Sequence, residues 1–416
     1  MYRLTNLARV AAAVTAIASL GCASDRDVLG PNPPVGGEIF KSYVALGNSI
    51  TAGFQSSGIN DSTQRQSYAR LFATQVGTQY HYAALSMPGC PSPVVNFQSQ
   101  ARVLTGLPAG ATAPPPCALR TTGSITDILN NVGVPGAASF DPIAITSPAS
   151  NALTTFILGG RTQVGRALQA KPTFASIWIG NNDVLGAGAS GILVPTPALG
   201  QNGILSTLAT FTASYDAMIK QLVDSAPGLK GALIGVVQIS GIPLLSTGDT
   251  LFRASAANRG VMNSIAGTPV TVDAGCSGSN VLVNVPSLLG AIRAGQHPAF
   301  ISCTKNFPAA PVGDIFVLDV AEQATLRAVV DSYNAYIAAK AAAIGFAYLD
   351  PNPLLAANKA TNAIPRFPNF TSTTATFGAL ISLDGFHPAG PAHRLIANAL
   401  IAAVNAKYGT SVQAVP

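Results

Sequence analysis

The stretch YVALGNSITAG, residues 43–53, decides the fold, because within it a short apolar run gives way to a glycine-flanked polar turn. An apolar run of this length, bounded by glycine and asparagine, is typical of a strand buried on both faces. Ser49 stands where that strand would end. A lone serine in a turn most often serves as a turn residue or a helix cap. A chemical role for Ser49 therefore needs support from the rest of the chain.

Strand-like and helix-like segments alternate along the chain. Short apolar runs predict strands at residues 42–47, 174–180, 232–238 and 345–350. Apolar residues recurring at three and four residue steps predict helices at residues 65–77, 205–226, 321–343 and 390–407. This alternation favours an α/β fold with a mostly parallel sheet.

Two long segments, at about 91–155 and 240–315, interrupt this alternation. Both are rich in Pro, Ala, Gly, Ser and Thr and show no clean periodicity. We interpret them as insertions at the ends of sheet strands, where ligand-binding loops usually lie. Inert decoration is the alternative for each. A single folded domain over residues 39–410 would carry both insertions.

The first 21 residues have the pattern of an export signal. Arg3 and Arg9 precede the apolar run VAAAVTAIASL, which is too short to span a bilayer in a mature protein. The end of this run, ASLGC, resembles a bacterial lipoprotein signal, in which the cysteine becomes the acylated first residue. Cys22 is therefore a candidate for lipidation, and residues 22–38 would form a tether. We expect an exported protein, anchored in the bacterial cell envelope or else periplasmic or secreted.

The charge content excludes one class of partner. Charged residues make up 10% of the chain, against about 25% in a typical soluble protein. The formal charge of +6 is spread thinly, with no run of Lys and Arg. Nucleic acid is not an expected partner, because its binding needs a basic patch. Membrane association is expected only through the N-terminal anchor.

The remaining four cysteines predict disulfides, as an even number does in an exported chain. Of three connectivities, sequential pairing joins Cys90 to Cys117 and Cys276 to Cys303 and closes two loops of similar size. Each bridge would contribute about 3 to 4 kcal/mol in the chain-entropy model. A metal site is the competing interpretation, but there is no CxxC pair and the histidines are not spaced with the cysteines. We therefore expect no metal.

A serine becomes a nucleophile only when a base can take its proton. The chain has four histidines, which are His81, His297, His387 and His393. In SLDGFHPAG, Asp384 precedes His387 by three residues, so the carboxylate can reach one imidazole nitrogen while the other faces outward. A loop histidine near a helix start is the alternative. His393, within GPAHRLIANAL, is expected on the polar face of its helix.

Two further stretches offer groups that could hold an oxyanion. IWIGNNDVLGAG places Asn182 after a buried strand, where a side-chain amide donates without carrying charge. A turn bond or a helix cap is the alternative for the NND triplet. In SMPGCPSP, Gly89 would let the backbone approach a substrate and offer its N–H.

In order and approximate spacing, GNSITAG, PGC, GNND and DGFH resemble the four sequence blocks of the SGNH hydrolases, also called GDSL esterases and lipases. The resemblance implies a three-layer α/β/α, flavodoxin-like fold and a serine esterase site without cofactor. It assigns Ser49 as nucleophile, His387 as base and Asp384 as the residue that orients the base. It assigns the oxyanion hole to the N–H groups of Ser49 and Gly89 and the amide of Asn182.

One position departs from the pattern of that family. The usual GDS is GNS here, with Asn48 in place of aspartate, which keeps a turn bond but loses the charge. The GxSxG elbow is absent around Ser49, which argues against an α/β-hydrolase fold.

The substrate implied by the resemblance is a small-molecule or lipid ester, cleaved through an acyl-enzyme. One alternative is a carbohydrate esterase that removes acetyl groups from polysaccharide. The single tryptophan, Trp178, lies inside a predicted strand and so offers no platform for a sugar. The other alternative is an inactive surface-binding lipoprotein, against which the intact Ser49, Asp384 and His387 weigh.

Overall fold

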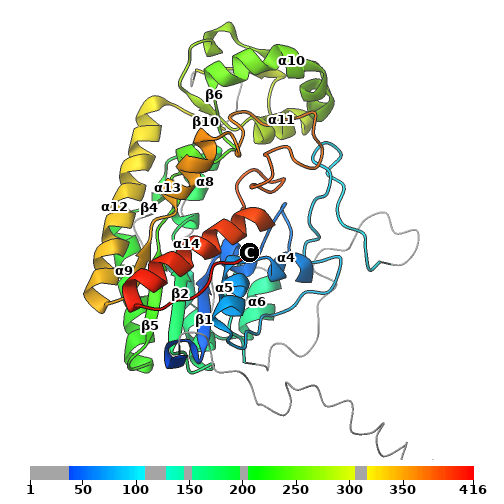
Figure 1. Cartoon of the computed structure of the whole chain (residues 1–416). Helices are drawn as coiled ribbons and strands as arrows, with labels where there is room; N and C mark the ends of the chain where they lie inside the picture. The colour runs from blue at the N-terminus through cyan, green and yellow to red at the C-terminus, as the bar shows by residue number, and fades with distance from the viewer. Residues whose placement is uncertain (1–36, 108–127, 145–151, 197–204, 305–315) are drawn as a thin grey trace, which may run out of the picture.

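The structure, a computed structural model, describes residues 37–107, 128–144, 152–196, 205–304 and 316–416. The predicted export signal, Cys22 and Cys117 lie outside the described residues, as does most of the predicted tether. Figure 1 shows a central sheet with helices around it and a smaller group of helices and short strands above it. We call this upper group, residues 246–303, the cap.

Four parallel strands form the central sheet, in the order β1-β2-β5-β11. They are β1 (Tyr43–Gly47), β2 (Phe174–Trp178), β5 (Lys230–Ile234) and β11 (Ala347–Leu349). Each overlaps one of the four predicted strands. Gly47 pairs with Trp178, so β1 and β2 end at the same level. The carboxyl ends of the parallel strands therefore meet along one edge, where ligands bind in open α/β sheets.

Four helices overlap the four predicted ones. They are α5 (Tyr68–Val76), α9 (Leu208–Ser225), α12 (Val320–Ile344) and α14 (Gly390–Tyr408). Local capping sets where they begin, since Ser67 accepts the Arg70 N–H at the start of α5. At the start of α12, Asp319 and Glu322 form a reciprocal capping box.

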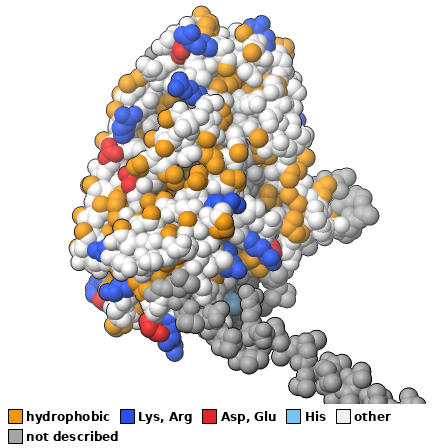
Figure 2. Space-filling model, viewed as in Figure 1, with side chains coloured by type: hydrophobic (Ala, Val, Ile, Leu, Met, Phe, Trp, Pro, Cys, Tyr) orange, Lys and Arg blue, Asp and Glu red, His pale blue; other side chains and the backbone are white. Residues whose placement is uncertain are grey.

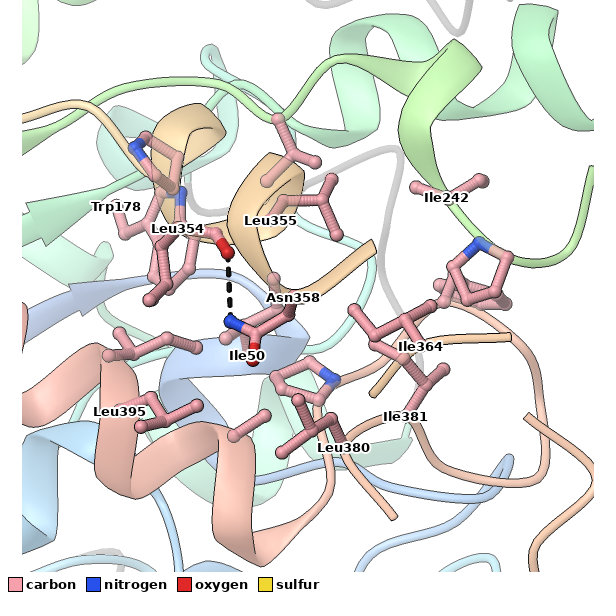
Figure 3. A pocket seen from close by; sticks show the side chains of 17 residues that line it. Ile50, Trp178, Ile242, Leu354, Leu355, Asn358, Ile364, Leu380, Ile381 and Leu395 are labelled. Carbon is pink, nitrogen blue, oxygen red and sulfur yellow. Dashed lines mark hydrogen bonds between the residues drawn. The ribbon is translucent and has the colours of Figure 1, made fainter. Parts of the chain in front are cut away.

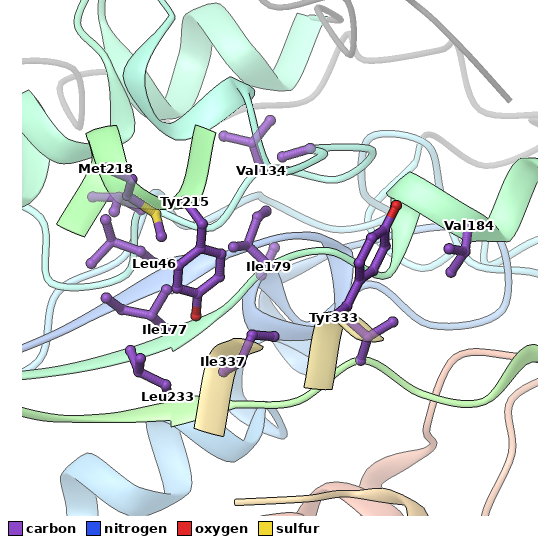
Figure 4. Close-up of a cluster of buried hydrophobic side chains, with 14 of the residues drawn as sticks. Leu46, Val134, Ile177, Ile179, Val184, Tyr215, Met218, Leu233, Tyr333 and Ile337 are labelled. Atoms are coloured by element: carbon purple, nitrogen blue, oxygen red, sulfur yellow. The ribbon is translucent and has the colours of Figure 1, made fainter. Parts of the chain in front are cut away.

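The two faces of the sheet bury different side chains, because successive strand residues point in opposite directions. On one face, Leu46, Ile177 and Leu233 pack in a cluster with side chains of α9 and α12, as Figure 4 shows. On the other face, Tyr43 and Phe174 pack with α5 and α14. Helices therefore cover both faces, and the chain has the predicted three-layer α/β/α fold.

Shorter elements connect these parts. The helical ones are η1 (Gly37–Phe40), α3 (Ser49–Ala52), α4 (Asp61–Arg65), η2 (Asp141–Ile143), α6 (Ala152–Leu158), α7 (Gln163–Leu168), α8 (Asn182–Ser190), η3 (Ile239–Gly241) and α13 (Asn352–Ala360). Two short strands, β3 (Pro195–Thr196) and β4 (Leu205–Ser206), pair in parallel. In the sequence, α3 begins shortly after β1 and α8 begins shortly after β2. The first residues of both helices therefore lie at the carboxyl edge of the central sheet.

A segment of the first predicted insertion extends the sheet beyond β1. The Val132 N–H bonds the Ala45 carbonyl and the Val134 N–H bonds the Gly47 carbonyl, both at 3.0 Å. This strand-like run, NNVGV, is too short and too rich in Asn and Gly to be predicted as a strand. Part of the segment 91–155 therefore belongs to the core of the fold.

The cap has a hydrophobic cluster of its own, within the second predicted insertion. Its helices are α10 (Gly248–Ala266) and α11 (Val285–Arg293), and its short strands and turn are β6 (Ser246–Thr247), β7 (Thr271–Val272), η4 (Ala274–Cys276), β8 (Leu282–Val283) and β9 (Phe300–Ile301). The strand β10 (Val317–Leu318) completes an antiparallel sheet in the order β10-β8-β6. The sequence of this insertion has no clean helical periodicity, so its helices were not predicted. The periodicity is weak because few side chains of α10 are buried; Leu251 and Met262 are among those few.

The cap is closed by a disulfide between Cys276 and Cys303, as in the sequential one of the three connectivities that the sequence allows. Both cysteines are buried in the cluster of the cap. Cys90 is also buried and disulfide-bonded. Its predicted pairing with Cys117 falls on a residue outside the described part of the chain.

The surface carries few charges. Figure 2 shows Lys and Arg side chains scattered over the visible face rather than gathered in one patch. In the part of the chain that the structure describes, no helix combines the length and the apolar character needed to cross a membrane.

Candidate active site

Ser49 is the first residue of α3, directly after β1. The preceding Asn48 caps this helix, with its Oδ1 accepting the Ile50 N–H at 3.0 Å. The turn depends on Gly47, which has φ 156°, and a Cβ there would lie 2.3 Å from Thr51 Oγ1 and 2.5 Å from the Trp178 carbonyl oxygen. Only glycine therefore allows the chain to turn so sharply that Ser49 stands at the sheet edge.

His387 joins Ser49 to Asp384 through both of its ring nitrogens. Nε2 lies 2.8 Å from Ser49 Oγ, and Nδ1 lies 2.9 Å from Asp384 Oδ2. Ser49 and the side chains of His387 and Asp384 are each at least nine-tenths buried. The structure thus brings together the three residues that the sequence assigns to nucleophile, base and orienting acid.

Asp384 is held in its ionised form. Its Oδ1 accepts the His387 N–H at 2.9 Å, and its Oδ2 accepts the Ser57 N–H at 2.8 Å. Burial opposes the charge, but the His387 ring and these N–H donors lower the pKa of Asp384 to about 2. The carboxylate therefore accepts the Nδ1 proton of His387 and leaves Nε2 free to accept the proton of Ser49.

The loop carrying His387 is braced from both sides. The backbone carbonyl of His387 accepts the Ser382 N–H at 2.9 Å, and Ser382 Oγ in turn accepts the Ser56 N–H at 2.8 Å. The rings of Phe54 and Phe386 lie 5.0 and 4.2 Å from the His387 ring, measured between centroids. The imidazole has little freedom to leave Ser49.

Asn182 lines the same cavity as Ser49 and His387. It is the first residue of α8, and its Nδ2 donates to the Ala137 carbonyl at 2.8 Å. An amide nitrogen has two hydrogens, so one N–H remains for a ligand. The position agrees with the oxyanion role assigned to Asn182.

Gly89 packs closely against Ile59. A Cβ at this position would lie 2.3 Å from the Ile59 carbonyl oxygen, and its φ is 118°. The described residues that line the cavity of Ser49 do not include Gly89. The glycine is needed for close packing of this loop against Ile59, a role for which the PGC motif gives no separate signal.

The segment 131–137 lies beside the residues of the site. The sequence did not predict this position. Asn131 Nδ2 donates to the Thr51 carbonyl at 2.8 Å, and a Cβ at Gly133 would lie 2.9 Å from Thr51 Cβ. The run then turns at Gly136, with φ 86°, and reaches Asn182 through Ala137. The available signal is the clustering of Asn and Gly around two valines in NNVGVPG.

The cavity also contains amide nitrogens without a partner. Asn48 Nδ2 and Asn181 Nδ2 are buried and have no hydrogen-bond partner among the described residues, and both residues line the cavity of Ser49. The oxygen of Asn181 is used, because it accepts the Val237 N–H at 3.0 Å. The side chain that replaces the usual aspartate therefore keeps the helix cap and adds an N–H donor beside the nucleophile.

Two other buried ionisable groups support the fold. His393 is fully buried in α14, which corrects the expectation of a polar-face position, and its Nδ1 accepts the Tyr68 N–H at 3.2 Å. Burial lowers the pKa of His393 to about 3. Burial raises the pKa of Asp183 to about 6, although this carboxyl accepts the N–H and hydroxyl of Ser139. Neither residue lines the cavity of Ser49.

Within residues 37–107, 128–144, 152–196, 205–304 and 316–416, the His, Cys, Asp and Glu side chains form no group of three or more that could hold a metal ion.

Comparison with known proteins gives one family match. The family model described as GDSL-like Lipase/Acylhydrolase matches residues 43–400, from β1 into α14. A solved structure from Parabacteroides merdae, described as a GDSL-like lipase, is 12% identical with a TM-score of 0.35, and the match covers 90% of this chain and 98% of that one. An extracellular lipase from Streptomyces rimosus is 15% identical with a TM-score of 0.32, covering 88% and 99%. No curated protein matches the chain.

Proposed function

The chain belongs to the GDSL-like lipase/acylhydrolase family and is an ester hydrolase, and from this premise we propose that it cleaves carboxylic esters through an acyl-enzyme on Ser49. The observation that carries the proposal is the unbroken chain of contacts from Ser49 Oγ through His387 to Asp384, at 2.8 and 2.9 Å. A serine hydroxyl so placed is activated for attack on a carbonyl carbon.

Acylation begins when Ser49 Oγ attacks the ester carbonyl and its proton passes to His387 Nε2. Asp384 holds the ring in the tautomer that can accept this proton and stabilises the imidazolium that forms. His387 then donates the proton to the alcohol oxygen as the ester C–O bond breaks. The alcohol leaves and the acyl group stays on Ser49.

Deacylation repeats the sequence with water. His387 takes a proton from water as its oxygen attacks the acyl carbon, and then returns the proton to Ser49 Oγ as that bond breaks. The products are the free carboxylic acid and the regenerated enzyme.

The oxyanion that forms in each half-reaction needs N–H donors. We assign the backbone N–H of Ser49 and the free amide N–H of Asn182. For the further backbone donor we favour the segment around Gly136 over Gly89, because Ala137 contacts Asn182 directly. Removing one such donor typically lowers kcat by about 10²–10³-fold.

The N-terminal segment leads to a proposal about location. The ASLGC sequence is compatible with a lipid anchor on Cys22 of an exported protein, with residues 22–38 as the tether. Cell fractionation of the full chain and of a Cys22→Ser variant tests this. Release of the variant from the membrane fraction is expected, and equal retention of both would contradict the anchor.

The test of the reaction is hydrolysis of p-nitrophenyl esters, from acetyl to palmitoyl, by the purified chain and by Ser49→Ala. We expect the variant to lose at least about 10⁴-fold in kcat without a change in unfolding, since the nucleophile is removed. A serine-directed fluorophosphonate should add its mass at Ser49. The control is Ser332→Ala, which removes an exposed hydroxyl on α12. Turnover that survives in Ser49→Ala would overturn the mechanism.

A further inference from the structure

An apolar cavity opens beside the catalytic serine, between α13 and the start of α14. Seventeen residues line it, and nearly all of them are apolar. Figure 3 shows Ile364, Leu380 and Ile381 closing one side and Leu354 and Leu355 of α13 another. Figure 2 shows hydrophobic side chains gathered on the surface near α13.

The wall of this cavity is almost entirely apolar. Only two lining residues carry a polar side-chain group, and each of them donates a hydrogen bond within the protein. Asn358 Nδ2 donates to the Leu354 carbonyl at 2.8 Å, and Trp178 Nε1 donates to the Gly235 carbonyl at 2.9 Å. A polar ligand would lose its hydrogen bonds to water on entry, whereas a hydrocarbon loses none.

The cavity adjoins the site of Ser49. Four residues line both the apolar cavity and the cavity of Ser49 and His387, namely Ile50, Val237, Ile242 and Phe386. Ile50 directly follows the nucleophile and Phe386 directly precedes the base. A chain attached to a carbonyl at Ser49 Oγ therefore passes along these side chains into the apolar cavity.

A second cavity, under the cap, has a different character. Its lining includes several polar side chains, which are Ser57, Gln98, Gln100, Asn284, Ser287 and Arg293. It also reaches Asp384 and Phe386, on the other side of the triad. Phe386 thus lines all three cavities, which places it where the apolar and the polar cavity meet beside the triad.

We propose that the cavity between α13 and α14 binds the acyl chain of the ester, so that esters with an extended apolar acyl chain are preferred to acetyl esters. This rests on the proposed ester hydrolysis at Ser49 and adds the substrate class. The alcohol portion then faces the polar cavity under the cap. Each methylene that moves from water into the apolar cavity raises kcat/KM by up to about fourfold, until the cavity is filled.

The first test fills each cavity separately. Ala392→Phe places a ring in the apolar cavity from α14, and Gly290→Phe places one in the cavity under the cap from α11. A Cβ at Gly290 meets nothing within 4 Å, so the control substitution is accommodated. We expect Ala392→Phe to lower kcat/KM for dodecanoyl esters at least about tenfold relative to acetyl esters. Gly290→Phe should leave this ratio unchanged.

A complementary variant enlarges the cavity. Leu380→Ala removes a half-buried side chain from its wall and should shift the preferred acyl chain to a longer one. If Ala392→Phe folds poorly, this shift still decides the question. A chain-length profile that changes with Gly290→Phe, and not with the two cavity variants, would place the acyl chain under the cap and overturn the proposal.

The second test does not depend on catalysis. Trp178 is the only tryptophan of the chain and lines the apolar cavity, so its fluorescence reports what enters there. In the full chain carrying Ser49→Ala, dodecanoate brominated at its terminal carbon should quench this emission, and unbrominated dodecanoate should not. Adding Ala392→Phe should weaken quenching at least about fivefold, and adding Gly290→Phe should not.

The two proposals fail in different ways. Quenching by the brominated acid without hydrolysis of any ester would refute the proposed function and leave the chain site standing. Hydrolysis lost in Ser49→Ala, together with a chain-length profile unaffected by Ala392→Phe and no quenching, would refute the chain site alone.

Discussion

The central sheet and the cap are stabilised in different ways. The strands β1 and β2 each have five residues buried on both sides beneath long helices, whereas the strands of the cap have two residues each and surround a disulfide. The contacts that hold the triad join residues 49, 56–57 and 382–387, and none of these belongs to the cap. The comparison implies that the sheet side determines the chemistry, while the cap shapes one wall of the substrate site.

The sharpest test of this division is Asp384→Asn. An amide cannot act as the charged acceptor for His387 Nδ1, so the ring loses the tautomer needed to accept the Ser49 proton. We expect kcat to fall by about 10³–10⁴-fold, as in other triads, with the amide hydrogen exchange of the cap unchanged.

The matched control is Asp224→Asn, which removes an exposed ion pair with Lys220 on α9. Such a pair contributes little, so activity and stability should stay close to those of the parent. A kcat for Asp384→Asn within tenfold of the parent would show that the carboxylate does not orient the base.

Removing the disulfide tests the other half of the comparison. The double variant Cys276→Ser, Cys303→Ser frees a loop with a sequence separation of 27 residues, which costs about 3.5 kcal/mol in the chain-entropy model. We expect faster hydrogen exchange and proteolysis within residues 246–303, with the exchange of β1 and β2 preserved.

Acetyl ester hydrolysis by this double variant should remain within about threefold of the parent, because the triad lies outside the cap. Equal loss of protection in the cap and in the central sheet would show that the two parts unfold as one unit.

The smallest expected effect is on stability in acid, and it arises from His393, which is buried where α14 contacts α5. Because burial lowers the pKa of His393 to about 3, below the unfolded value of about 6.5, its contribution to stability is complete above pH 6.5. This contribution is lost progressively as the pH falls from about 6.5 towards 3, and the loss in the free energy of unfolding is about 2 kcal/mol by pH 5.

In His393→Gln the amide oxygen can still accept the Tyr68 N–H, but nothing titrates at this position. Urea unfolding at pH 7 and pH 5 should therefore show a smaller acid loss in the variant than in the parent. The same loss in both proteins would place the acid-sensitive group elsewhere.

The sequence predicted best those parts of the central sheet and of the site that leave a local pattern. Strands buried on both faces leave apolar runs, so the four sheet strands could be located, and the polar residues that follow them include Ser49 and Asn182. The Asp-x-x-His turn identified Asp384 and His387 because its geometry is local. The even number of cysteines predicted disulfides, but the pairing of Cys276 with Cys303 was one of three connectivities that the sequence left open.

Other features depend on contacts between distant segments and leave no local pattern. The run 130–134 becomes strand-like only because β1 offers it an open edge. The helix α10 buries few of its side chains, so its periodicity is weak. His393 looks polar in sequence and is buried only because α5 packs over it. The apolar cavity is assembled from six separate segments of the chain.

The position of Phe386 between the apolar cavity and the cavity under the cap bears on how the products depart. In the proposed mechanism the alcohol is released first, towards the cap, and can diffuse away while the acyl group is still attached. In the proposed binding mode the carboxylic acid forms last and keeps its chain among α13 and α14 residues, with its carboxylate beside His387. Turnover on long-chain esters would then be paced by departure of the acid, so that an initial burst of alcohol precedes a slower steady state and free fatty acid accumulates as an inhibitor.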